Sequence, residues 1–150
     1  MSADRIERDT FIEAPVERVW EIVTEPEHVG RWFSDAGAEI DLRPGGAMSM
    51  TWEEHGTVYG RVEAVERPSR FALRWAAQMG SRDIERNSTL VEFTLAPEGE
   101  GTRLRVVESG FASLDMPETD RIAKADGNSE GWQIELGHLT DYVAHPAVMR

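Results

Sequence analysis

The sequence predicts an α+β protein in which a curved antiparallel sheet wraps around a long helix near the C-terminus. Between Ala36 and Ser109 the chain is a series of alternating apolar and polar stretches separated by turns, the pattern of antiparallel strands. The segment 128–144 instead has the spacing of one apolar helix face. That face carries four residues: Trp132, Leu136, Leu139 and Val143. No other helical pattern in the chain is long enough to cover this face, so we expect it to lie on the sheet.

The N-terminal part predicts one strand followed by two short helices. Residues Arg5–Ile12 alternate as a strand, and Pro15 then suits the first turn of a helix whose apolar stripe runs from Val16 to Val23. Pro26 ends this helix and opens a second one, Glu27–Trp32. Two short helices in succession leave no room for a crossover between parallel strands, which favours an antiparallel sheet.

The middle of the chain predicts a run of strands and tight turns, giving six or seven strands in all and the order β-α-α-β6-α. The turn at 43–46 contains a proline and two glycines, which permit positive φ or a close approach of another segment. The expected strand cores are Ala38–Leu42, Met48–Trp52, Val58–Ala64, Phe71–Trp75, Val91–Leu95 and Leu104–Glu108.

The C-terminal part predicts a connector and then the long helix. We expect Gly110–Gly127 to be a lid-like connector, helical at most in part, because it shows no sustained periodicity. The helix is expected to begin at Asn128 and to end shortly before Pro146. Ile134 lies off the apolar stripe, so the sequence is also compatible with a helix that contacts the protein on a second side.

Composition restricts the class of protein. The 150 residues, 40% hydrophobic and 29% charged, predict one globular domain over residues 1–150. We expect no membrane insertion, since the apolar runs are short, and a cytoplasmic location by default, since the first residues lack a signal-peptide core. The net charge of −12 argues against nucleic-acid binding, and the absence of cysteine excludes thiolate chemistry.

Large aromatic and sulfur-containing side chains gather on the predicted inner face, which is compatible either with a filled core or with a ligand cavity. Spacing alone does not separate these two interpretations. In the second one, the cavity opens near Trp32 and is bounded mainly by Met48, Met50, Trp52, Trp75, Phe93 and Trp132. The full set of candidate ligand-binding residues is Trp32, Met48, Met50, Trp52, Tyr59, Trp75, Phe93, Glu108, Trp132 and Leu136.

Glu108 is the most informative polar residue. It shares strand parity with Leu104 and Val106, so regular pairing turns its carboxylate inward, where it would be the main polar feature of the cavity. The alternative places it at the strand end, in solvent. As a candidate catalytic residue, Glu108 would act with His28, Tyr59 or Arg74.

Other chemistry finds no support in the sequence. The histidines lack the spacing of metal ligands, and no serine lies in a nucleophile elbow. The glycines at 45–46 do not join a strand to a helix as a phosphate-binding loop requires. We therefore expect neither a metal nor a cofactor.

Six short motifs occur in an order that resembles a known superfamily. They are Ile12 to Trp20, His28 to Phe33, Arg43 to Gly46, Gly60 to Val62, Glu108 to Phe111, and Gly131-Trp132 with Leu136 and Leu139. Together they are similar to the SRPBCC (START-like, Bet v 1-like) superfamily, in the branch that resembles the C-terminal domain of the activator of heat-shock protein 90 ATPase.

The resemblance implies the helix-grip fold, with a seven-stranded antiparallel sheet around the C-terminal helix and a hydrophobic cavity between them. The leading hypothesis is a protein, monomer or homodimer, that binds a small, largely hydrophobic molecule without catalysis. One alternative is a cyclase- or hydratase-like enzyme that uses the same cavity. The other is an interaction module that acts on a chaperone in the stress response. Fold alone does not choose among them.

Overall fold

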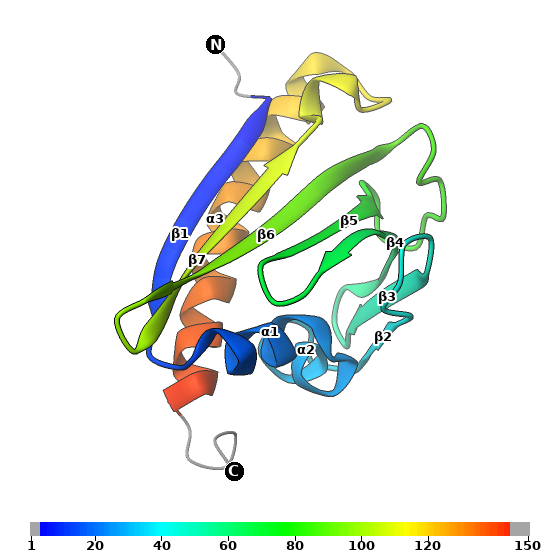
Figure 1. Cartoon of the computed structure of the whole chain (residues 1–150). Helices are drawn as coiled ribbons and strands as arrows, with labels where there is room; N and C mark the ends of the chain where they lie inside the picture. Colours follow the sequence, from blue (N-terminus) through cyan, green and yellow to red (C-terminus); the bar gives the residue numbers. More distant parts are fainter. Residues whose placement is uncertain (1–3, 145–150) are drawn as a thin grey trace.

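The computed structural model describes residues 4–144, and within them it shows a seven-stranded antiparallel sheet that curves around a long helix (Figure 1). The predicted fold class is confirmed. Neighbouring strands follow the order β1-β7-β6-β5-β4-β3-β2. The strands are β1 (Arg5–Ile12), β2 (Ala38–Ile40), β3 (Ala47–Trp52), β4 (Gly56–Glu66), β5 (Arg70–Ala76), β6 (Ser88–Glu98) and β7 (Gly101–Ser109).

Strands β2 to β7 form a meander, and β1 joins the far edge by pairing with β7 from Arg5 opposite Ser109 to Ile12 opposite Thr102. The register of β4 against β5 shifts between Val62 and Ala64. Such a bulge bends a strand and increases its twist. It therefore contributes to the curvature that lets the sheet enclose a helix.

Two short helices close one end of the sheet (Figure 1). Helix α1 (Val16–Thr24) and helix α2 (Pro26–Trp32) confirm the predicted pair. Glu25 between them is extended, with φ −86° and ψ 129°, because the ring of Pro26 disfavours a helical residue before it. This single extended residue turns the chain and directs the buried residues of both helices toward the sheet.

The long helix α3 spans Glu118–Ala144, so the prediction that it begins at Asn128 is wrong. Its first turns carry no apolar stripe: Ala125 is the first buried residue and Ile122 is 37% exposed. Hydrophobic periodicity therefore could not reveal them. The available signal was Pro117 followed by acidic residues in the first turn, a combination that favours a helix N-terminus.

The lid-like connector is correspondingly shorter than predicted. It consists of the 3₁₀ turn Phe111–Ser113 and a few following residues, and it is attached to the core because Phe111 and Leu114 are buried. The prediction that Gly110–Gly127 is a connector is wrong from Glu118 onward. The predicted helix end at Pro146 lies outside the described residues.

Helix α3 packs on the sheet as predicted, with Trp132, Leu136, Leu139 and Val143 all buried. Ile134 is 57% exposed, so α3 has no second buried side at this residue.

The turn at 43–46 needs its two glycines for different reasons. Gly45 has φ +86°, and a Cβ at Gly46 would lie 2.0 Å from the carbonyl oxygen of Asp41.

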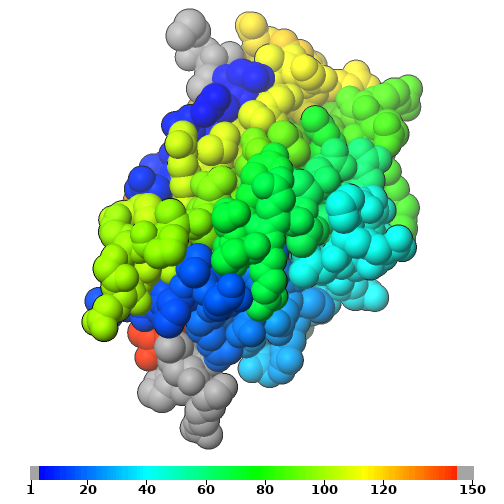
Figure 2. All heavy atoms as spheres, in the orientation of Figure 1, coloured from blue at the N-terminus to red at the C-terminus, as the bar shows by residue number. Residues whose placement is uncertain are grey.

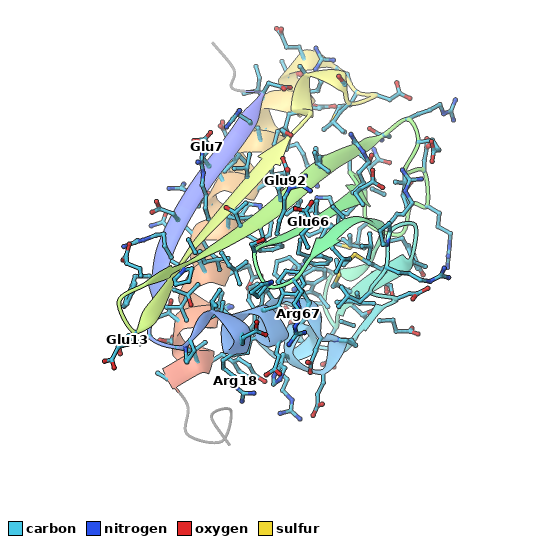
Figure 3. The ribbon with its side chains drawn as sticks, viewed as in Figure 1. Glu7, Glu13, Arg18, Glu66, Arg67 and Glu92 are labelled. Atoms are coloured by element: carbon cyan, nitrogen blue, oxygen red, sulfur yellow. The ribbon has the colours of Figure 1, made fainter. Side chains whose placement is uncertain are left out.

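The outward face of the sheet is charged. Arg70 pairs with Glu66 and Glu92 at 3.0 and 2.7 Å, and Arg105 pairs with Glu7 at 2.8 Å; the three glutamates are labelled in Figure 3. Strands cover this face, and α3 is largely hidden behind them (Figure 2). Among the described helices, none combines the length and apolar character needed to cross a membrane.

Candidate functional site

An apolar pocket lies between the concave face of the sheet, α2 and α3. Its free volume is about 20 Å³, roughly the space of one water molecule. Each lining side chain is apolar or aromatic: Val23, Val29, Trp32, Phe33, Ile40, Met48, Met50, Phe71, Leu73, Trp75, Phe93 and Trp132. In this state, side chains almost fill the space between sheet and helix.

Six of the candidate residues line this pocket: Trp32, Met48, Met50, Trp75, Phe93 and Trp132. Their role in binding a ligand stays a prediction. Trp32 is only 3% exposed and Phe33 beside it is partly buried, so the expectation that the pocket opens near Trp32 stays a prediction. Its indole N–H donates to the Ile22 carbonyl at 2.9 Å, which fixes the ring inside.

Phe33 occupies the centre of the aromatic cluster. Its ring stacks on Trp75 at 5.7 Å and 18° and on Trp132 at 5.5 Å and 27°. These two indoles also stack on each other, at 5.7 Å and 16°. Trp32 and Trp52 meet the same ring edge-on, at 5.4 and 5.3 Å. Offset-stacked and edge-to-face pairs at these separations are the favoured arrangements of aromatic rings.

Glu108 is completely buried, so the inward orientation is confirmed and the alternative in solvent is wrong. Its carboxylate accepts hydrogen bonds from Trp132 Nε1 at 2.8 Å, Trp75 Nε1 at 2.9 Å, Thr89 Oγ1 at 2.5 Å and Asn128 Nδ2 at 3.1 Å. These donors come from α3, β5 and β6. Glu108 therefore joins the helix to the sheet through hydrogen bonds.

Glu108 does not line the pocket, so the prediction that it is the main polar feature of the cavity is wrong. Trp75 and Trp132 direct their N–H groups to the carboxylate, and their rings line the pocket. Strand parity reports the direction of a side chain but not what stands in front of it. Burial lowers the pKa of the nearby Lys124 ammonium, and the negative charge of Glu108 opposes that shift.

Three other candidates lie apart from the pocket lining. Trp52 is partly buried and donates from Nε1 to the Phe33 carbonyl at 3.2 Å. Leu136 is buried in the core without lining the pocket. Tyr59 lies beneath the Arg82 guanidinium at 3.8 Å, in a second groove that shares only Ile40 and Met48 with the pocket, because strand alternation turns it away from the face of Val62. Tyr59 is therefore not a residue of this cavity.

The expected catalytic partners do not converge on Glu108. His28 Nδ1 lies 2.7 Å from the hydroxyl of Tyr142, and Arg74 pairs with Glu63 at 3.6 Å. Neither of them, nor Tyr59, is among the hydrogen-bond partners of Glu108 in residues 4–144. In the same residues, no group of three or more His, Asp or Glu side chains is placed to hold a metal ion.

Sequence reasoning did not include Phe33 among the candidate pocket residues. Phe33 follows the last residue of α2, where neither helical nor strand periodicity assigns a face. The signal that could have found it is the adjacent aromatic pair Trp32-Phe33 at a helix end. Phe71 and Leu73 also line the pocket, from the buried face of β5.

Comparisons with known proteins agree with the fold. Residues 13–144 match the family model described as Activator of Hsp90 ATPase homolog 1-like protein. No curated protein matches the chain. Among solved structures, protein MLL2253 from Mesorhizobium loti is 21% identical, with a TM-score of 0.77, over 93% of this chain and 96% of that chain.

Two further structures are each 25% identical to this chain. DynU16, a protein in the dynemicin biosynthetic locus, has a TM-score of 0.75 over 95% of this chain but 48% of its own, so this chain spans about half its length. CalU16 from Micromonospora echinospora has a TM-score of 0.71, over 97% of this chain and 79% of that chain.

Proposed function

The chain belongs to the Activator of Hsp90 ATPase homolog 1-like protein family, and from this premise we propose that it binds a small, largely hydrophobic ligand between the sheet and α3. The observation that supports the proposal is the aromatic lining of the space that α3 covers. Trp32, Trp75, Trp132 and Phe33 line it, together with Met48 and Met50 of β3. Trp52 meets the Phe33 ring edge-on. Thioethers and indoles adapt to irregular apolar molecules.

The small free volume of the pocket, about 20 Å³, limits what can bind without rearrangement. A ligand larger than one water molecule has to displace at least one side chain, so the bound form differs from the form described here. The similarity to DynU16, whose locus is a biosynthetic one, also favours a small-molecule role for the fold.

Titration of tryptophan fluorescence with a panel of neutral hydrophobic compounds tests the proposal. We expect saturable quenching, because three indoles line the pocket, and weaker binding in Trp132→Phe, which removes part of the wall. Tyr59→Phe is the matched control, since Tyr59 lies in the second groove. If no compound changes the fluorescence, the aromatic cluster is a filled core and the proposal fails.

The family description favours a second candidate, a protein that stimulates the ATPase of heat-shock protein 90. Its test is the rate of ATP hydrolysis by the purified chaperone with and without this protein. A saturable increase in the rate would support this function, and an unchanged rate would exclude it.

A further inference from the structure

We propose that the pocket takes flat, neutral aromatic molecules, and that the ligand ring replaces the ring of Phe33 against Trp75 and Trp132. The proposal rests on the proposed function and goes beyond it by naming the class of ligand and the side chain that is exchanged. Phe33 is then the internal occupant of the pocket in the absence of ligand and the residue that selects for ring shape.

The first reason is that Phe33 already sits as an aromatic ligand would sit. Its ring lies within 27° of parallel to both indoles, with centroid distances of 5.5 and 5.7 Å. Trp75 and Trp132 are held in that orientation from behind, because Glu108 accepts both N–H groups. The two indoles are therefore preorganised to stack on a flat ring.

The second reason is that the pocket offers no hydrogen bond. The N–H groups of the three lining tryptophans already have acceptors: the Ile22 carbonyl for Trp32, and Glu108 for Trp75 and Trp132. The N–H of Trp52, which lies outside the lining, donates to the Phe33 carbonyl. The remaining lining is aliphatic, aromatic or thioether. A charged or strongly polar group would lose its hydration there without compensation. The ligand is therefore neutral where it meets the pocket.

The third reason is that Phe33 can leave without disturbing the fold. It caps α2 rather than lying inside a helix or strand, and its side chain is partly exposed. Its backbone stays in place, because its N–H donates to Val29 at 3.0 Å and its carbonyl accepts from Trp52 at 3.2 Å. We expect a rotation of its side chain between staggered conformers to carry the ring toward solvent.

The experiment compares 2-naphthol with decahydro-2-naphthol, which has the same carbon skeleton and hydroxyl but is saturated and not flat. For the wild-type protein we expect 2-naphthol to bind about tenfold tighter, the discrimination that two stacking contacts supply. In NMR spectra of phenylalanine-labelled protein, the Phe33 ring signals should move toward those of a free side chain. The Phe33 signals are assigned as those that disappear from the spectrum of the Phe33→Leu variant.

Phe33→Ala provides the second measurement. It should bind 2-naphthol about fivefold or more tighter than wild type, because no ring has to be displaced. Phe11→Ala is the matched control, since Phe11 is a 37% exposed phenylalanine on β1, and it should leave the affinity unchanged. The NMR measurement on the wild type keeps the test valid if Phe33→Ala does not fold.

The outcomes separate this inference from the proposed function. Equal affinity for the two naphthols, or unmoved Phe33 signals on binding, overturns the aromatic exchange and leaves hydrophobic binding standing. Tighter binding of tetramethylammonium than of 2-naphthol would indicate a cation cage and also overturns it. Binding by Phe33→Ala but not by the wild type would show that the truncation created an artificial cavity, and it also overturns the exchange. Absence of binding to either protein defeats both proposals.

Discussion

Replacement of Glu108 by glutamine should destabilise the protein strongly, although the two side chains have nearly the same shape. The carboxylate accepts hydrogen bonds on both oxygens and is fully buried. Oε1 faces the indole N–H of Trp132, and Oε2 faces that of Trp75. Whichever way the amide of glutamine is turned, its NH₂ group therefore meets an indole N–H, and two donors oppose each other.

The size of the effect follows from these contacts. One buried indole N–H without an acceptor costs about 1–3 kcal/mol, and the remaining hydrogen bonds lose the extra strength that a charged acceptor gives. Release of the carboxylate from its buried position offsets part of this cost. We expect a net loss of about 2–4 kcal/mol in the free energy of unfolding, or roughly 5–15 °C in Tm for a domain of this size.

Urea unfolding monitored by tryptophan fluorescence and by circular dichroism measures the difference. Glu92→Gln is the matched control: it changes the same groups in an ion pair with Arg70 on the outward face. A surface pair of this kind contributes about 1 kcal/mol or less. If Glu108→Gln were as stable as Glu92→Gln, the carboxylate would not be the link between α3 and the sheet, and the reasoning would be wrong.

Trp132→Ala should lower the free energy of unfolding by about 3–5 kcal/mol, because it removes a buried ring between α3 and the sheet. Ile134→Ala, on the exposed side of α3, should change it by less than about 0.5 kcal/mol, and equal urea midpoints for the two variants would contradict this. Gly131→Ala should stabilise the protein by about 0.5–1 kcal/mol, since a Cβ at this helical position meets nothing within 4 Å. Gly60→Ala should destabilise the protein, since its Cβ would lie 2.6 Å from a carbonyl oxygen of β5. Thermal melts in which Gly60→Ala is the more stable variant would refute this prediction. Burial lowers the pKa of Lys124 from its usual 10.5, so between the lowered value and 10.5 the unfolded chain holds more protons and the free energy of unfolding should rise with pH. Lys124→Met should lack this part of the rise, and an unchanged slope in unfolding curves measured across that range would count against it.

Much of the fold could be predicted because hydrophobic periodicity is a local property. The apolar side of an element can be recognised from the alternation in 47–52 and 101–109 and from the helical stripe between Trp132 and Val143. With one long stripe and many half-apolar strands, an antiparallel sheet around a helix is the arrangement that buries them all. The start of α3 escaped this reasoning because its first turns are largely exposed and so carry no stripe.

The candidate site depended on distances between elements, and periodicity contains no such information. The sequence by itself placed Met48, Met50, Trp75 and Trp132 on the enclosed side, and strand parity predicted an inward Glu108 with a solvent-exposed strand end as the alternative. Only the tertiary structure decided that two indoles stand between Glu108 and the pocket, and that Phe33, from the end of α2, packs against both of them. The physical reason is that a side chain's direction is set by its own strand or helix, whereas the space in front of it is set by whichever distant residues pack there.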